Sequence, residues 1–93
     1  MLSSSDNLSD LQKQINKLQD EVVRLEQQIK ALSLELMVKQ DDLQQLSNLS
    51  NSEERMKKLQ DEIAQLERGI QALSNQVKAK EEELKKLRTL LKK

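Results

Sequence analysis

The chain has 93 residues, with 16 Lys and Arg balanced by 16 Asp and Glu, and it lacks His, Cys, Pro and aromatic residues. Without Cys and His, the sequence excludes thiol nucleophiles, imidazole bases and zinc fingers. Because charged residues make up 34% and hydrophobic residues 35% of the chain, we expect an all-α coiled-coil protein that is not an enzyme and needs no cofactor.

The first predicted element is a helix over residues 9–46, preceded by a polar segment, residues 1–8, that we expect to be frayed. Ser9, with Gln12 three residues later, has the form of a capping box. Apolar side chains then recur at alternating spacings of three and four residues, which predicts the a and d seam of a coiled coil. The seam residues are Leu8, Leu11, Ile15, Leu18, Val22, Leu25, Ile29, Leu32, Leu36, Leu43 and Leu46.

Residues 47–52, Ser-Asn-Leu-Ser-Asn-Ser, are predicted to interrupt the helix, because Ser and Asn favour turns and caps. Ser50 with Glu53, or Asn51 with Glu54, can cap a second helix. The seam resumes one residue out of step, and one residue turns a side chain by about 100° around a helix. A helix running straight through would carry its apolar stripe off the partner, so the pattern indicates two helices.

The second predicted helix covers residues 53–93 and repeats the first. The segment Lys17–Leu49 aligns with Lys58–Leu90 at an offset of 41 residues, and close to half of the aligned pairs are identical. Gly69 lies beside the seam and costs about 1 kcal/mol against Ala, which weakens this helix without cancelling it. The seam residues are Met56, Leu59, Ile63, Leu66, Ile70, Leu73, Val77, Leu84, Leu87 and Leu91.

The favoured arrangement is an antiparallel coiled-coil hairpin, which can associate further into a helical bundle. Folding back through residues 47–52 pairs Leu46 with Met56 and, at the other end, Leu11 with Leu91. The alternative that the sequence leaves open is a kinked, extended coiled-coil dimer.

Two lysines are the only polar residues that interrupt the seam. In the hairpin register Lys39 faces Ile63 and Lys80 faces Val22, and each lysine lies close to a glutamate of the opposite helix. We expect these ion pairs to lock the register, because a polar residue in the seam lowers the stability of the coiled coil but disfavours other alignments of the helices. The alternative is that both lysines extend to water beside the seam. The register candidates are Lys39, Glu62, Lys80 and Glu21.

The seam flanks are acidic, with Arg55 and Arg88 as the basic exceptions, which indicates a partner chain with basic flanks. The outer face of the first helix also carries a candidate partner patch, formed by Ala31, Leu34, Met37 and Val38. At the corresponding positions the repeat has Ala72, Asn75, Lys78 and Ala79, so the two largest apolar side chains become polar and the valine becomes alanine. Four apolar residues at helical spacing on one helix only favour a contact with another subunit.

Part of the pattern resembles the coiled-coil, leucine-zipper region of the TBPIP family, the homologous-pairing proteins of meiotic recombination. The matching runs are Leu11-x3-Ile15-x2-Leu18-Gln19-x2-Val22-x2-Leu25, Leu43-x2-Leu46-Ser47 and Glu54-x2-Lys57-x-Leu59-Gln60-Asp61. The resemblance implies a zipper that pairs with a different coiled-coil subunit and assists strand-exchange recombinases. Its DNA-binding winged-helix domain has no counterpart in these residues, and a generic or designed coiled coil fits the same pattern.

The expected partner is therefore this chain itself or another coiled-coil protein, with no small-molecule substrate. No apolar run approaches the roughly 18–20 residues that span a bilayer, so we expect no membrane contact. Glu81–Glu83 interleave the C-terminal lysines, and we do not expect direct nucleic-acid binding. The expected location is intracellular and soluble, or nuclear if the TBPIP resemblance holds.

Overall fold

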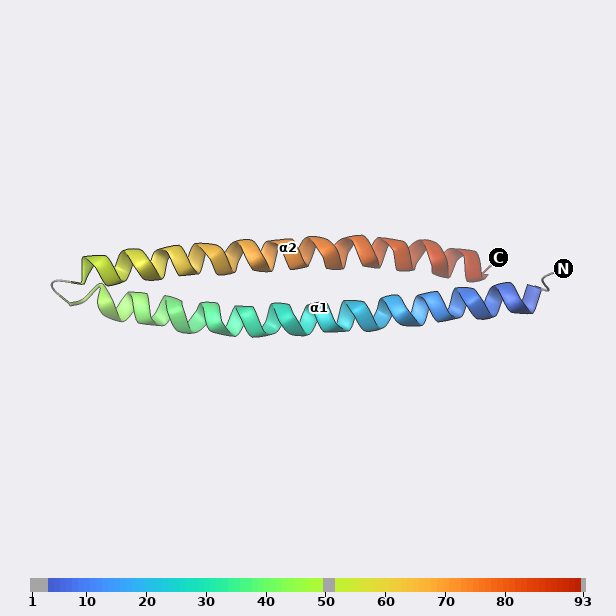
Figure 1. Cartoon of the computed structure of the whole chain (residues 1–93), viewed down its shortest axis with the longest axis horizontal. Coiled ribbons are helices and arrows are strands. Elements are labelled where there is room, and N and C mark those ends of the chain that lie inside the picture. Colours follow the sequence, from blue (N-terminus) through green and yellow to red (C-terminus); the bar gives the residue numbers. More distant parts are fainter. Residues whose placement is uncertain (1–3, 50–51, 93) are drawn as a thin grey trace.

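The computed structural model describes the backbone of residues 4–49 and 52–92 and the side chains from Leu8 onward. Helix α1 spans Ser4–Leu46 and helix α2 spans Glu53–Lys92. The two helices lie side by side and antiparallel, connected at one end, with both termini at the other end (Figure 1). The hairpin measures 75 × 18 × 14 Å. This confirms the predicted fold class of two long helices in an antiparallel hairpin.

Helix α1 begins earlier than the predicted capping box. The structure starts the helix at Ser4, so Ser9 is an exposed residue inside α1 rather than its cap. Residues 4–8 contain neither Pro nor Gly, and adding residues to an existing helix gains hydrogen bonds without a new nucleation cost. The frayed segment expected over residues 1–8 is thus corrected for residues 4–8, while residues 1–3 lie outside the described part.

The seam packs most tightly in the half of the hairpin nearest the termini. Its buried cluster comprises Ile15, Leu18, Val22, Val77 and Leu84, and Ile15 is only 2% exposed. Leu11, Leu25, Ile29, Leu87 and Leu91 pack against this cluster. Towards the turn, Ile63 is the one described apolar residue that is buried, and the remaining seam residues there are half-buried. A single helix–helix contact shields one side of each helix, so it leaves much of the seam partly open.

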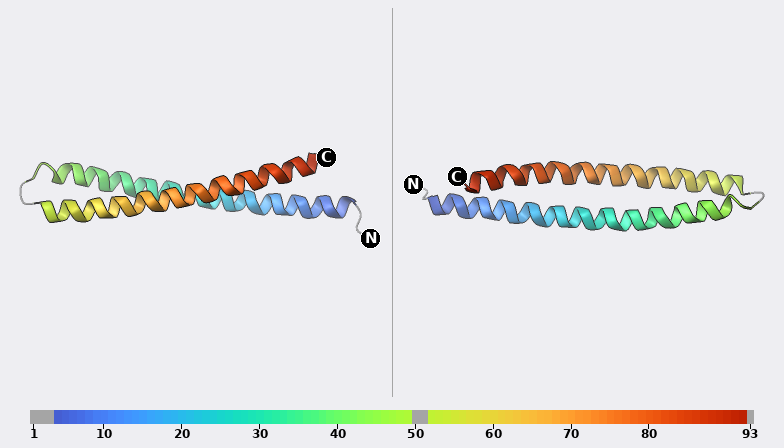
Figure 2. Two further views of the ribbon diagram at one scale, coloured as in Figure 1. Left: turned by 90° about the horizontal axis from the view of Figure 1, so that it is seen from above. Right: turned by 180° about the vertical axis from the view of Figure 1, so that it is seen from behind.

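Three cross-helix contacts show that the register stays constant along the hairpin. Lys39 binds Glu62, Lys80 binds Glu21, and Leu32 lies 3.8 Å from the position that a Cβ at Gly69 would occupy. Adding the two residue numbers gives the same total for each of the three pairs. In an antiparallel pairing without a shift, one number rises by as much as the other falls, so the total stays constant. The helices also cross as they run (Figure 2, left), which is the winding expected of a coiled coil.

The connection between the helices depends on Ser52, a residue that the sequence pattern did not single out. Its backbone carbonyl accepts a hydrogen bond from the Met56 N–H at 2.9 Å, which opens α2. Its hydroxyl is the shared donor to the carbonyl oxygens of Leu46, at 2.8 Å, and Leu49, at 3.0 Å. Ser52 is 6% exposed, so it satisfies carbonyls at the end of α1 away from bulk water. The predicted caps Ser50 and Asn51 lie outside the described residues.

Replacing Gly69 with Ala should stabilise the hairpin by about 0.5–1 kcal/mol, because Ala loses less backbone entropy in a helix. The added methyl group would lie at ordinary contact distance from Leu32. Urea denaturation followed by circular dichroism measures the change. The matched control is Q76A, one heptad further along α2, which should change stability by less than about 0.5 kcal/mol. A less stable G69A would show that the two helices cannot accommodate a side chain at this point.

Candidate functional site

The structure brings the four register candidates together in two separate ion pairs. The Nζ of Lys39 donates to Oε2 of Glu62 at 2.7 Å, and the Nζ of Lys80 donates to Oε2 of Glu21 at 2.7 Å. Helical periodicity places each lysine in the seam of its own helix and each glutamate on the flank of the other helix. The two pairs therefore tie α1 to α2 at two points, separated along the hairpin.

The positions of Lys39 and Lys80 fit both roles that the sequence left open, an ion pair that fixes the register and a side chain that extends to water beside the seam. The residues that face them in the seam, Ile63 and Val22, are only 9% and 7% exposed, while the lysine side chains remain 24% and 31% exposed. In this register the aliphatic stems of Lys39 and Lys80 lie over the apolar seam, and the ammonium groups reach the glutamates at its edge. We expect the stems to help to shield apolar residues and the charged ends to select one alignment of the helices.

Hydrogen bonds across the seam lower the pKa values of both glutamates. The hydrogen bond from Lys80 lowers the pKa of Glu21 below its ordinary value of 4.5, and that from Lys39 does the same to the pKa of Glu62. The hydrogen bond to Glu62 also raises the pKa of Lys39 above 10.5. At neutral pH, both glutamates are therefore ionised, and their hydrogen bonds to the lysines favour the folded hairpin.

The edge of the seam that carries the ion pairs is acidic. Glu35, Asp42 and Glu83 lie at the same heptad position as Glu21 and Glu62, and all three are exposed. A shallow groove of about 350 Å³ opens on this edge, between Glu35 on α1 and Glu62 and Gly69 on α2. An edge of this composition suits a helix with basic flanks.

The outer face of α1 carries an exposed apolar patch, formed by Ala31, Leu34, Met37 and Val38. Ala31 is exposed, and the three larger side chains are 56%, 60% and 58% exposed. They lie on the side of α1 opposite the seam, because the seam residues Leu32 and Leu36 are half-buried against α2. Helix α1 is thus apolar on two faces, of which α2 covers one.

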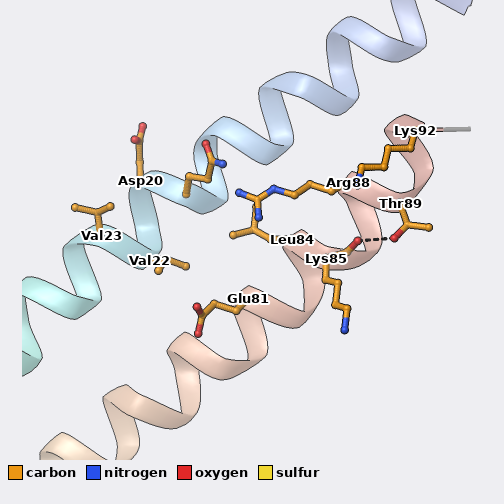
Figure 3. A pocket seen from close by; sticks show the side chains of 10 residues that line it. Asp20, Val22, Val23, Glu81, Leu84, Lys85, Arg88, Thr89 and Lys92 are labelled. Carbon is orange, nitrogen blue, oxygen red and sulfur yellow. Dashed lines mark hydrogen bonds between the residues drawn. The ribbon is translucent and has the colours of Figure 1, made fainter.

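A larger groove of about 890 Å³ lies between the helices near the termini (Figure 3). Val22 and Leu84 contribute apolar side chains to it, and Arg88 extends across towards α1 while Lys85 points away. Acidic and basic side chains both line this groove: Asp20 and Glu81, with Lys85, Arg88 and Lys92. Mixed charge of this kind suits another polypeptide better than the uniformly negative backbone of a nucleic acid.

The glutamates should make the hairpin less stable in acid. A carboxyl group with a lowered pKa contributes stability that is present above its unfolded value, near 4.5, and is lost as the pH falls through the folded value. We expect the melting temperature of the chain to drop between about pH 5 and pH 3, and to drop less in E21Q/E62Q. Melting followed by circular dichroism across this range measures the difference.

The control for the acid titration is E26Q/E67Q, which alters the corresponding pair of exposed glutamates on the other edge of the seam. This variant should keep the acid-induced drop of the unaltered chain. If E21Q/E62Q and E26Q/E67Q responded to acid alike, the ion pairs would not be the source of the pH dependence.

Replacing both seam lysines with leucine, K39L/K80L, should raise the melting temperature and loosen the oligomeric state. Leucine completes the apolar seam, and the loss of two charged groups removes the penalty on competing registers. Thermal melting and native mass spectrometry measure the two effects. The control K17L/K58L adds leucines at corresponding exposed positions outside the seam. A variant K39L/K80L with lower stability and one unique state would contradict the register role.

Within residues 4–49 and 52–92, the structure contains no cluster of three or more acidic, His or Cys side chains that could hold a metal ion. Neither described helix is long and apolar enough to cross a membrane. Comparison of the chain with protein-family models, with curated proteins and with solved structures finds no match.

Proposed function

We propose that this chain is a non-enzymatic coiled-coil module for oligomerisation and protein interaction, which presents a preformed helical hairpin to another α-helical chain. The observation that carries the proposal is the apolar patch on the outer face of α1. Leu34, Met37 and Val38 are more than half exposed, although the same helix already buries its seam against α2. A helix that is apolar on two opposite faces packs best between two neighbours.

The energetics favour such an association. Full burial of a Leu, Met or Val side chain stabilises a complex by about 1.5–3 kcal/mol, and these residues still have roughly half of that to gain. Leu25, Leu36 and Leu43 are also only half-buried. A second helical unit packed along the hairpin can therefore bury apolar surface that one chain leaves open, while the polar remainder of both helices stays in water.

A second candidate function is the partner-binding arm of a recombination accessory complex, as the TBPIP resemblance implies. The acidic edge that holds Glu35, Asp42 and Glu83 favours it, because an unrelated coiled-coil chain with lysines on its flanks would complement this charge. The two candidates differ in the partner, which is another copy of this chain in the first and a basic coiled-coil chain in the second.

Small-angle X-ray scattering with mass determination distinguishes these candidates. A single hairpin should have a longest dimension close to 75 Å. In the first case the mass should exceed that of one chain, and the longest dimension should lie between this value and roughly 140 Å. In the second case the chain alone should have the mass of one chain and should bind a synthetic heptad peptide with lysine flanks. A longest dimension of roughly 140 Å at the mass of two chains would indicate an extended zipper instead of a hairpin. A single chain that ignores the peptide would overturn the proposed function.

A further inference from the structure

The apolar patch on α1 lies between charges of opposite sign. Lys30 precedes it on the outer face of the helix and Asp41 follows it, and both side chains are exposed. From this arrangement we infer that the patch is the docking surface for a second copy of the same chain, with the two α1 helices antiparallel and related by a two-fold axis. The inference rests on the proposed function, whose first candidate takes another copy of this chain as its partner, and it specifies the surface and the orientation of the contact.

The positions of the charges fit this symmetry. The residues of the patch are centred near position 35, and Lys30 and Asp41 are centred between positions 35 and 36. Each charge therefore lies about 8 Å along the helix from nearly the same point. A two-fold axis through that point superimposes the two apolar patches and places Lys30 of each copy beside Asp41 of the other. The surface complements itself in both apolar character and charge.

The direction of the side chains supports the same geometry. At 100° per residue, Lys30 and Asp41 lie on the same side of Leu34 around the helix, within about 40° of it. When antiparallel helices are related by a two-fold axis across their contact, like sides face each other. Met37 lies about 60° from Leu34 on that same side, so the two charge pairs can form on either side of the Leu34–Met37 contacts along the helix axis. Ala31 and Val38 face each other on the opposite side of Leu34.

Helix α2 lacks the corresponding surface, which limits the size of the assembly. Its equivalent positions hold Asn75, Lys78 and Ala79, and all three are exposed. Each hairpin therefore offers one docking face, on α1. A contact between two identical faces closes on itself, so the assembly stops at two chains instead of growing into a filament.

The first test transfers the polar residues of α2 onto α1. The triple variant L34N/M37K/V38A places on α1 the residues that α2 tolerates at the equivalent positions, so the helix should still form. We expect sedimentation velocity to show two chains for the unaltered protein and one chain for the variant, with unchanged helix content. The matched control N75S/K78Q/A79S alters the equivalent positions of α2 and should keep the mass of two chains.

The second test reverses the charges. K30D or D41K alone places like charges together twice in the two-fold complex and should weaken association roughly tenfold. The double variant K30D/D41K restores opposite charges and should recover the affinity of the unaltered chain. Only an antiparallel contact between copies makes this recovery possible, because a parallel contact or a different partner would not pair these two positions.

The outcomes separate this inference from the proposed function. A mass of two chains that survives L34N/M37K/V38A, or a charge reversal without recovery, would overturn the two-fold docking and leave an interaction module that uses another surface. A single-chain mass together with binding of the lysine-flanked peptide would also overturn it and favour the second candidate function. A single-chain mass without peptide binding would overturn both.

Discussion

The antiparallel seam between α1 and α2 is the one contact on which the rest of this structure depends. Over the described residues no third element covers either helix, so each seam residue has only the opposite helix and its own turn as neighbours. Side chains such as Ile15 and Leu84 become buried because the two stripes stay in register over the full length of the hairpin. One residue inserted into either helix would turn the rest of its stripe by about 100° and expose it. Register is therefore the property that this sequence has to specify most strictly.

The internal repeat explains why the same ion pair between the helices occurs twice. Lys39 and Glu62 in one ion pair correspond, through the offset of 41 residues, to Lys80 and Glu21 in the other. The hairpin thus behaves as an antiparallel dimer of two similar helices that a short connection has joined. Each copy supplies one lysine and one glutamate, and the approximate two-fold symmetry brings each lysine to the glutamate of the other copy. The shared hydrogen bonds of Ser52 hold the connection at one end of this arrangement.

The outer faces break the symmetry that the seam preserves. Leu34 and Met37 on α1 are replaced by Asn75 and Lys78 on α2, although the surrounding seam is similar in both copies. Since these positions do not contact the opposite helix, the requirements of the hairpin do not explain the difference. An additional neighbour on α1 would explain the difference, and this is the physical basis for proposing an interaction function for this face.

The sequence by itself determined the two helices, because heptad periodicity and a break in its phase are local patterns. It favoured the antiparallel pairing and the glutamate partners of Lys39 and Lys80, but the choice between the hairpin and the extended dimer came from the tertiary structure. It also identified the apolar patch, since side chains at positions such as Leu34 must point away from the seam of a regular helix. Only the tertiary structure decided where α1 begins and which seam residues are buried, because helix ends depend on small differences in free energy and burial depends on both helices together. The role of Ser52 likewise became visible only in three dimensions. Several Ser and Asn residues in the connection have similar capping ability, and the approach of the two helix ends selects the one that can reach the carbonyl of Leu46.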